Sequence, residues 1–483
     1  MKHIMKSPLI IVESPSKIKT LKKYLDKNYI IEASVGHFRD LPKSKLGIEV
    51  DNNFSAEYHV AKDSTKTVQT LKKALKKSDA LFIATDPDRE GEAIAWHIVD
   101  ELKPKVPTKR LVFNEITKTA ILESFNHTRD IDNNLVDAQE TRRFLDRLFG
   151  FTVSEKMWRN MKTGVSAGRV QSPAIKILVD REKERKKFKQ NEYWSISGVF
   201  ETKDAKIDAK LIKIGSKKIA TGNSFDKKTG QLYNADDIVL NEKTSNDLIE
   251  KIILNDWKVD KLEQKPVTQK PYAPFITSTL QQEGIKQFRM SAQNIMRIAQ
   301  TLYENGYITY MRTDSVHLSN EAISASRKEV KKLYGNKYLP SNGIQYTGKV
   351  KNAQEAHEAI RPAGSTFKHP EELKSKLDAN QLKLYTLIWK RTLASQMMPA
   401  KIQRTTLWIS DNEYIFEAKG KIILFPGFLK VYVEATENEK NRDDDEKVLP
   451  DLNEKQPLNC LSLDKKQHFT KPINRFTEAS LVK

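Results

Sequence analysis

The chain has 483 residues, too many for one hydrophobic core, so about three or four domains are expected. Lys and Arg exceed Asp and Glu by 83 − 63 = 20, which favours a polyanionic partner, nucleic acid before membrane; a basic surface that serves only solubility is the plainer alternative. One cysteine excludes an internal disulfide and a cysteine zinc site, and no stretch resembles a signal peptide or a membrane span, so a cytoplasmic protein is expected.

The first 135 residues alternate between short apolar runs and helical patterns, which predicts an α/β domain with a mostly parallel sheet. The predicted strands are residues 9–12, 29–35, 80–85 and 110–116. Glu13 and Lys17 follow the first strand, at the edge where open α/β sheets bind ligands. Asp86, Asp88 and Glu90 follow the third strand, and oxygen ligands at this spacing suit Mg²⁺. The alternative is an acidic turn that caps the next helix, but three acids opposite Glu13 favour the metal.

Residues 136–190 are helical and basic, and a break of small residues at 164–172 interrupts them. Small residues let backbone amides and polar side chains approach phosphates, although a plain turn between two helices is the alternative. Polar residues that could bind phosphates here are Arg142, Arg147, Ser166, Arg169 and Gln171.

Composition then changes. Residues 191–274 and 399–436 alternate like strands, with a hairpin across residues 410–412, whereas residues 275–398 form a helical block inserted between them. Residues 264–274 are predicted as a connector because of their prolines, residues 276–304 as one helical stretch, and residues 437–445 as a charged linker.

Tyr310 and Arg312 follow Gly306, which is a natural helix stop. In an extended backbone, residues two apart point the same way, so the phenol would lie beside a guanidinium. Tyrosine has a pKa of about 10 and needs an anion-stabilising neighbourhood to act as a nucleophile, and arginine is the side chain best shaped for phosphate. The alternative is a half-buried strand in which the two residues alternate for structural reasons.

Five motifs occur in order along the chain. They are Val-Glu-Ser-Pro-Ser-Lys at 12–17, Thr-Asp-Pro-Asp-Arg-Glu-Gly-Glu at 85–92, Ser-Ala-Gly-Arg-Val-Gln-Ser at 166–172, Ile-Thr-Tyr-Met-Arg-Thr-Asp-Ser at 308–315 and Ala-His-Glu-Ala-Ile-Arg-Pro at 356–362. Together they closely resemble bacterial DNA topoisomerase I, a type IA topoisomerase, over nearly the whole chain.

The resemblance implies a site that two domains share. Tyr310 matches the nucleophile that attacks a phosphate of single-stranded DNA, and Arg312 matches the arginine that holds this phosphate. Glu13 matches the acid that protonates the leaving 3′ oxygen, and Lys17 matches the cation that stabilises the transition state. The other implied residues are Glu13, Asp86, Asp88 and Glu90 as Mg²⁺ ligands, His357 as a supporting histidine, and His37, Arg142, Arg147, Ser166, Arg169, Gln171 and Arg361 as DNA contacts.

The resemblance also implies a multidomain fold of α/β, helical and β-rich parts. The expected parts are a Toprim domain with a Rossmann-like parallel sheet (1–135), a helical DNA-binding domain (136–190), a β-rich arch in two segments (191–274 and 399–436), a helical domain that carries the nucleophile (275–398), and a linker that returns to the DNA-binding domain (437–483). These parts would form a toroid that is incomplete at the C-terminus, because family sequences continue past Lys483 and a truncated chain is expected.

The implied activity relaxes negatively supercoiled DNA through a 5′-phosphotyrosine, without ATP, and the chain accordingly lacks a P-loop motif. A monomer with Mg²⁺ as cofactor is expected, acting on DNA in the bacterial cytoplasm and nucleoid and not on a membrane. Two alternatives stay open. A Toprim nuclease or primase would share the acids but not the tyrosine segment, and a truncated, inactive fragment would only bind DNA.

Overall fold

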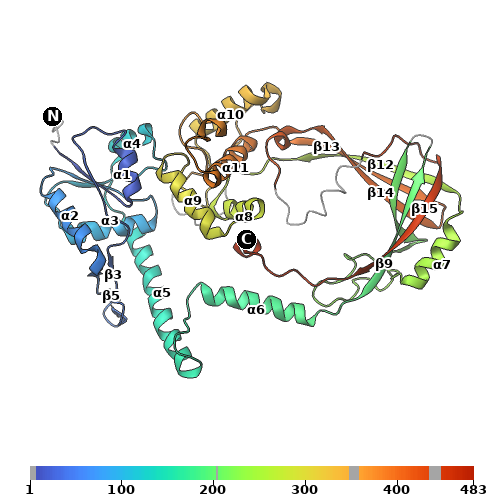
Figure 1. Ribbon diagram of the computed structural model, residues 1–483, viewed down its shortest axis with the longest axis horizontal. Helices are drawn as coiled ribbons and strands as arrows, with labels where there is room; N and C mark the ends of the chain where they lie inside the picture. The colour runs from blue at the N-terminus through green and yellow to red at the C-terminus, as the bar shows by residue number, and fades with distance from the viewer. Residues whose placement is uncertain (1–6, 203–204, 348–357, 435–447) are drawn as a thin grey trace. The chain divides into compact units, whose positions relative to one another are not determined.

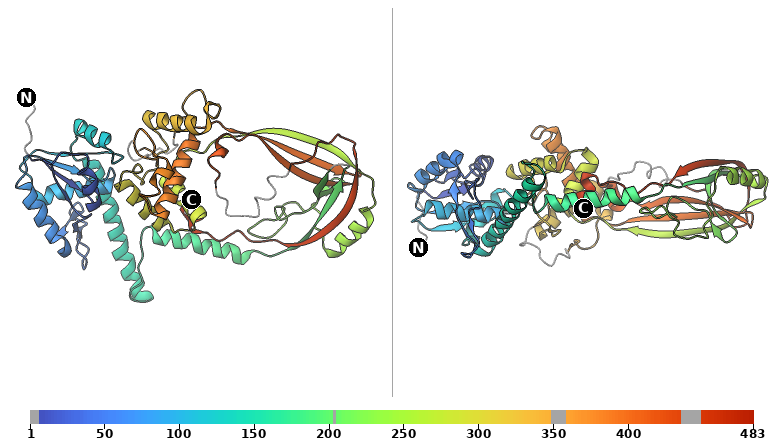
Figure 2. Two further views of the ribbon diagram at one scale, coloured as in Figure 1. Left: turned by 45° about the horizontal axis from the view of Figure 1, so that its top comes forward. Right: turned by 90° about the horizontal axis from the view of Figure 1, so that it is seen from below.

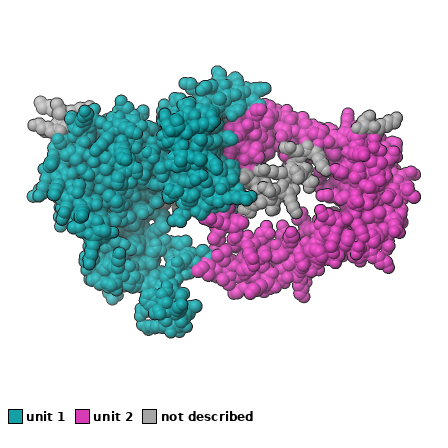
Figure 3. Space-filling view, in the orientation of Figure 1, with its two compact units in different colours: residues 1–174, 273–396, 482–483 teal, residues 175–272, 397–481 magenta. Residues whose placement is uncertain are grey.

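The computed structural model describes residues 7–202, 205–347, 358–434 and 448–483. The chain divides into two compact units, coloured separately in Figure 3. Unit 1 comprises residues 1–174, 273–396 and 482–483, and unit 2 comprises residues 175–272 and 397–481. Each unit is therefore assembled from segments that are far apart in the sequence. No described helix is both long enough and apolar enough to cross a membrane.

Unit 1 begins with a four-stranded parallel sheet in the order β2-β1-β7-β8. Its strands are β1 (Leu9–Val12), β2 (Ile30–Ala33), β7 (Leu81–Ala84) and β8 (Thr108–Arg110). Helices α2 (Thr65–Leu75) and α3 (Arg89–Leu102) pack on the face that carries Leu9 and Ile83. On the other face, Phe82 contacts Phe125, which follows helix α4 (Lys118–Ser124). The predicted α/β fold with a parallel sheet is confirmed.

One predicted strand is misplaced. The fourth strand ends at Arg110, whereas residues 110–116 were expected to form it. The Leu111 amide still donates to the Ile83 carbonyl at 3.0 Å, but the backbone beyond it serves another contact: the Asn114 carbonyl accepts a hydrogen bond from the Tyr310 amide at 2.8 Å. The remaining short elements of this region are α1 (Pro15–Leu21), η1 (Lys62–Ser64), η2 (Phe125–His127) and two antiparallel pairs, β3 (Arg39–Asp40) with β6 (His59–Val60) and β4 (Ile48–Glu49) with β5 (Ser55–Ala56).

Two helices follow, α5 (Asn133–Asn160) and α6 (Gln171–Lys187). Asp132 caps α5, because its side chain accepts hydrogen bonds from two backbone amides of the first turn. The small residues at 164–172 lie in the connection between the helices and in the first turn of α6, where the break was expected.

The helical block of unit 1 contains α8 (Thr277–Phe288), α9 (Ala292–Glu304), α10 (Asn320–Tyr334) and α11 (Ala379–Ser395), with the short turns η3 (Asn336–Tyr338) and η4 (Pro370–Leu373). Helices α8, α9 and α11 pack against one another (Figures 1 and 2). The prediction of one helical stretch over 276–304 is wrong in detail. Arg289 adopts a left-handed conformation (φ 54°), which ends α8, and Ser291 then caps α9 by accepting from the Asn294 amide.

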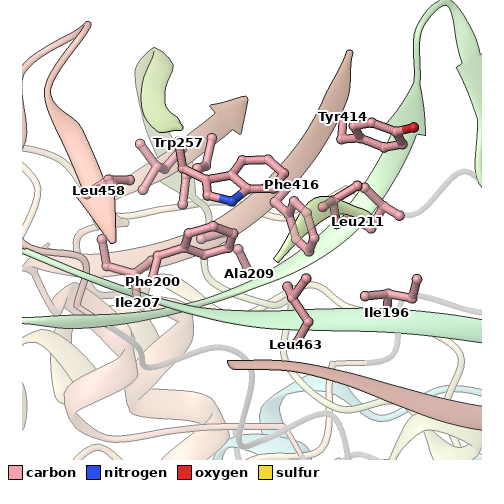
Figure 4. Packing of buried hydrophobic residues seen from close by; sticks show 14 of the residues in the cluster. Ile196, Phe200, Ile207, Ala209, Leu211, Trp257, Tyr414, Phe416, Leu458 and Leu463 are labelled. Carbon is pink, nitrogen blue, oxygen red and sulfur yellow. The ribbon is translucent and has the colours of Figure 1, made fainter. Parts of the chain in front are cut away.

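Unit 2 is built on a seven-stranded antiparallel sheet in the order β11-β10-β14-β13-β12-β15-β9. Strand β9 also pairs with β10, which closes six of the strands into a ring around an apolar core. The rings of Phe200, Trp257 and Phe416 meet edge-to-face at the centre of this core, with centroids 5.1–5.4 Å apart (Figure 4). The elements are β9 (Glu192–Glu201), β10 (Lys206–Ile214), β11 (Lys217–Lys218), α7 (Glu242–Ile252), β12 (Trp257–Gln269), β13 (Ala400–Ser410), β14 (Tyr414–Phe425), η5 (Gly427–Lys430) and β15 (Pro457–Phe469), and α12 (Glu478–Val482) ends the chain.

Two predictions about this region are wrong. Strand β12 runs on to Gln269 through the segment predicted as a connector, because Pro266 pairs with β13 on one side while β15 pairs with β12 only at residues 257 and 258. A proline is tolerated on such an open edge. Strand β15 belongs to the sheet, whereas residues 437–483 were expected to be a linker and a return to another domain. The predicted linker at 437–445 lies outside the described residues.

Candidate active site

Two acidic side chains meet at the carboxyl edge of the parallel sheet. Strands β1 and β7 are neighbours, with Val12 paired to Ala84, so the residues that follow them leave the sheet side by side. Glu13 follows β1 and Asp86 follows β7, and their carboxyl groups lie within electrostatic reach of each other. Ligands of open α/β sheets bind at this edge.

The turn between β7 and α3 holds the second and third acids in place. Asp88 caps α3, with its Oδ1 accepting a hydrogen bond from the Gly91 amide at 2.8 Å. A Cβ atom at Gly91 would lie only 2.1 Å from the carbonyl oxygen of Asp86, so the turn excludes every residue but glycine at this position. Helix capping, the alternative considered for these acids, is therefore observed for the Oδ1 atom of Asp88. Its Oδ2 atom is left for another partner.

Sequence patterns gave no sign of a buried arginine beneath this turn. Arg110 is 0% exposed, and its guanidinium donates to the carbonyls of Ile83 and Asp86 at 2.8 and 3.3 Å. It also donates to Glu92 Oε2 at 3.1 Å, and Glu92 accepts from Arg129 at 2.7 Å as well. Burial lowers the pKa of Arg110, and the negative charge of Glu92 opposes this. Arg110 ends β8, whose other residues are Thr108 and Lys109, so this short polar strand does not indicate the buried support.

Lys17 brings a buried positive charge to the same edge. Its side chain is 1% exposed and forms an ion pair with Asp86 Oδ1. The ammonium nitrogen lies 5.5 Å from the centre of the Tyr303 ring, which adds a cation–π contact from helix α9. A buried cation needs such partners, so Lys17 is fixed where its charge faces the acids.

Glu13 is the acid whose protonation responds most to this environment. Burial, followed by the negative charge of Asp86, raises its pKa to about 7, although the Lys17 ammonium partly offsets the rise. Its Oε2 atom is buried and has no hydrogen-bond partner among the described residues. A carboxyl group with this pKa is half protonated at neutral pH, and it can therefore both donate and accept a proton there.

The segment that carries Tyr310 is irregular, whereas an extended strand was expected. Helix α9 ends at Glu304, and Gly306 then adopts φ 72°, where a Cβ atom would lie 2.4 Å from the Ile116 carbonyl oxygen. Only Ile308 forms an isolated bridge, to Pro362. The close approach at Gly306 and the backbone hydrogen bond from Tyr310 to residue 114 fix this segment against the α/β part of unit 1.

The phenol of Tyr310 points at the acids. Tyr310 is 2% exposed, and its hydroxyl donates to Asp88 Oδ2 at 2.5 Å. Burial, together with the negative charges of Asp86 and Asp88, raises the pKa of Tyr310 far above its ordinary value. The ring of Tyr303 packs edge-on against it, with 5.2 Å between centroids. The phenol is thus held in its protonated form, and the Asp88 carboxylate accepts a hydrogen bond from it.

Arg312 lies at the open side of the same group. Its Nη1 atom is 2.8 Å from Glu90 Oε2 and 3.8 Å from Asp88 Oδ2, and about half of its side chain is exposed. The imidazole of His37, 3.5 Å from Glu90, is the main cause that lowers the pKa of Glu90 to about 2, and Arg312 adds to the effect. Tyr310 and Arg312 therefore both reach Asp88, although no strand presents them.

The acidic side chains are of the type that binds magnesium, but in the described part of the chain they do not converge around a single point. Among the described residues, no three Asp, Glu, His or Cys side chains converge as metal ligands. Glu13, Asp86 and Asp88 nevertheless supply hard oxygen atoms, and the repulsion that raises the Glu13 pKa is the charge imbalance that a divalent cation relieves. Glu90 is instead taken by Arg312 and His37. These side chains fit Mg²⁺ in kind, with Asp86 and Asp88 at the centre.

The residues predicted to contact DNA fall into different environments. Ser166 and Gln171 are exposed at the start of α6 and are linked by a hydrogen bond from Gln171 to the Ser166 carbonyl at 2.8 Å. Arg169 pairs with Asp146 at 2.8 Å. Arg142 is exposed on α5, and Arg147, which contacts the Phe151 ring, donates to the Leu46 and Lys45 carbonyls.

Arg361 is a buried residue, unlike the other residues predicted to contact DNA. It is 4% exposed, and its guanidinium is shared between Glu115 at 2.9 Å and Glu358 at 2.7 Å. Its carbonyl accepts from the amide of Thr309, the residue before Tyr310. These contacts favour a structural function over the predicted DNA contact, because the guanidinium is buried and two of its three nitrogens already bond to carboxylates. His357 lies outside the described residues.

Comparisons with known proteins agree with this geometry. Residues 130–483 match the DNA topoisomerase family, and residues 8–116 match the Toprim domain. The chain belongs to the DNA topoisomerase family. It is 48% identical to DNA topoisomerase 1 of Synechococcus elongatus and 47% identical to DNA topoisomerase 1 of Mycolicibacterium smegmatis, over 98% of its own length and 55% and 54% of theirs. The resemblance predicted from the five motifs is thereby confirmed.

The topoisomerase fold is confirmed as well. The structure of full-length topoisomerase I from Thermotoga maritima matches with a TM-score of 0.79 and 36% identity, over 98% of this chain and 74% of that one. The chain spans about half the length of the curated relatives it matches. The expected toroid concerns how the two units are arranged, and it stays a prediction, as do the domain boundaries other than those of the predicted C-terminal linker.

Proposed function

We propose that this topoisomerase cuts one strand of DNA through Tyr310, passes DNA through the break and reseals it, which relaxes negative supercoils without ATP. The observation that carries the proposal is the hydrogen bond of 2.5 Å from the Tyr310 hydroxyl to Asp88. It brings a nucleophile from the helical block to a cluster of acids on the Toprim domain. Cleavage needs both groups, and neither part of the chain supplies both.

In the cutting step, the Tyr310 oxygen forms a bond to the scissile phosphorus while the bond from phosphorus to the 3′ oxygen breaks. Asp88 accepts the phenolic proton along the existing hydrogen bond. Glu13, with a pKa of about 7, donates a proton to the leaving 3′ oxygen. Resealing runs the same transfers in reverse. One phosphoester replaces another, so the break retains the energy needed to close it.

The cations of the site stabilise the phosphate during this exchange. Arg312 is half exposed and is held by acids on one side, so its guanidinium can bind an incoming phosphate on the other. Lys17 is buried behind Asp86 and supplies fixed positive charge without reorganising. Phosphoryl transfer depends on such positioning and charge more than on further covalent chemistry.

Mg²⁺ is the cofactor that we propose, because Toprim domains bind Mg²⁺ in topoisomerases and the acids here are hard oxygen ligands. Asp86 and Asp88, assisted by Glu13, would hold the ion, while Glu90 would support Arg312. When bound, the ion would neutralise phosphate charge and lower the repulsion among the acids. The substrate that we propose is a single-stranded segment of negatively supercoiled DNA, bound by a monomer in the bacterial cytoplasm; the net charge of +20 supports a DNA partner.

An end-label experiment tests the proposal. The protein is incubated with single-stranded DNA and Mg²⁺, denatured, and resolved on a gel that separates free from protein-linked fragments. Protein-linked 5′ ends with free 3′ hydroxyls are expected, and Tyr310→Phe should abolish them. Tyr307→Phe is the matched control, since it removes a nearby hydroxyl that has no hydrogen bond among the described residues. Free 5′-phosphate ends would instead indicate a nuclease, and binding without cleavage would contradict the proposal.

A further inference from the structure

A polar cavity of about 530 Å³ opens beside Arg312 in unit 1. It lies among three segments: the turn that carries Asp88 and Glu90, helix α5, and the start of helix α8. Its volume falls within the range of about 300–1,000 Å³ that is usual for small-molecule sites. The acids and Arg312 on one wall belong to the site described above, but the other two walls have no function in it.

The two remaining walls present polar side chains in matched pairs. Gln139 and Arg142 are three residues apart on α5, and Ser278 and Gln281 are three residues apart on α8, so each pair lies on one face of its helix. None of these four side chains has a hydrogen-bond or ion-pair partner among the described residues. On the wall next to Tyr310, the side chain of Arg312 already contacts those of Asp88 and Glu90, whereas the opposite walls offer unused donors and acceptors.

The wall formed by α8 is rigidly joined to the catalytic segment. The Thr277 hydroxyl donates to the Met311 carbonyl at 2.8 Å and accepts from the Thr313 amide at 2.9 Å. These bonds grip the backbone on both sides of Arg312. A group bound against Gln281 would therefore be held at a fixed place relative to the residue that binds the scissile phosphate.

The charges around the cavity favour a neutral polar ligand. Three carboxylates line it, from Asp88, Glu90 and Asp314, and three guanidiniums line it, from Arg89, Arg142 and Arg312. The formal charges cancel, so a phosphate gains little inside, whereas a neutral ring with hydrogen-bonding edges gains from the amides. A nucleobase has this chemistry, and single-stranded DNA can swing a base out of its stack.

We propose that this cavity binds the base of a nucleotide adjacent to the scissile phosphate, and that Gln281 and Gln139 read its edge. Each carboxamide offers one acceptor and two donors to the base. Arg142, which is exposed at the rim, contacts the backbone phosphate. The inference rests on the proposed function, because it takes Arg312 as the group that holds the cleaved phosphate. It assigns this topoisomerase a base preference close to the cut, set by two glutamines.

Binding that needs no cleavage provides the first test. The Tyr310→Phe protein is titrated with four homopolymeric single-stranded oligonucleotides of equal length at one salt concentration. We expect the wild-type cavity to favour one base over the worst by roughly tenfold, and Gln281→Ala or Gln139→Ala to reduce that ratio by roughly three- to tenfold. Arg142→Ala should weaken all four oligonucleotides alike, as a phosphate contact does.

Gln282→Ala is the matched control, because Gln282 is the neighbour of Gln281 on the same helix but does not line the cavity. It should leave the ratio unchanged. Equal affinity for all four bases in the parent protein, or a ratio that survives both glutamine substitutions, would overturn the inference.

Mapping of cut sites in a random single-stranded pool separates this inference from the proposed function. If protein-linked ends form and Gln281→Ala removes the base bias at one position next to the cut, both stand. If protein-linked ends form with a bias that the glutamine substitutions do not change, only the base-reading inference is wrong. If no protein-linked ends form, the cleavage proposal is wrong, and the binding ratio alone decides the inference.

Discussion

Replacement of Glu13 by glutamine should make the α/β part of unit 1 more stable at alkaline pH while it abolishes cleavage. The substitution keeps the shape of the side chain and removes its charge. In the folded protein, burial and the neighbouring Asp86 raise the pKa of Glu13 from 4.5 to about 7. Between these two pH values the folded state holds a proton that the unfolded state has lost, so the stability contributed by this group falls as pH rises.

The size of the effect follows from the shift. Each unit of pKa difference corresponds to about 1.4 kcal/mol, so ionised Glu13 costs roughly 3 kcal/mol at pH 8 and less than about 1 kcal/mol at pH 5. Glu13→Gln removes this cost. The variant should therefore exceed the wild type by roughly 3 kcal/mol at pH 8, with the difference shrinking toward pH 5.

Hydrogen exchange of peptides that cover β1 and β7, measured without Mg²⁺ at matched pH, reports the opening of this part independently of unit 2. Glu123→Gln, at an exposed position on α4, is the control and should show no pH-dependent gain. A Glu13→Gln protein that is less stable at pH 8, or a difference that does not vary with pH, would refute the reasoning. The proton-donor function proposed for Glu13 would then lose its physical basis.

Three further outcomes are expected. Gly91→Ala should lower covalent adduct formation at least about 100-fold, because its methyl group would meet the Asp86 carbonyl oxygen at 2.1 Å; near-normal adduct on a gel would show that the turn can yield. Arg361→Met should destabilise unit 1 by about 3–5 kcal/mol, since it leaves two largely buried carboxylates without their cation, and an unchanged melting temperature would contradict this. The adduct formation rate should be level below pH 7 and fall about tenfold per unit well above it, as Glu13 loses its proton; a quench series from pH 6 to 9 with no fall would exclude Glu13 as the donor.

Local patterns predicted the parts of the fold that depend on local physics. The apolar runs of β1 and β7 are buried on both faces, and the acids after them meet because parallel neighbours end at one edge. The spacing of Tyr310 and Arg312 predicted only that the phenol would lie beside the guanidinium, and in the structure both side chains reach Asp88. The strand assumed for them was not needed, because Gly306 and a backbone hydrogen bond to residue 114 aim the segment instead.

The rest depended on contacts between distant segments. Pro266 suggests the end of a strand unless it is known that this part of β12 has an unpaired edge. Strand β15 lacks a strong alternation of apolar and polar residues because much of it is exposed. The sequence places Arg110 in a strand and suggests Arg361 as a DNA contact, and only their carboxylate partners reveal a structural function. Sequence spacing could not supply those partners, since they come from other elements.

The most direct test of the central claim is to locate the DNA on the protein. The covalent complex formed with single-stranded DNA is digested with nuclease and trypsin, and the peptide of residues 298–312, which contains Tyr303, Tyr307 and Tyr310, is fragmented in a mass spectrometer. A nucleotide phosphate on Tyr310, joined through the 5′ side of the DNA, is the predicted result. A nucleotide on either of the other two tyrosines, or a 3′ linkage, would contradict the account.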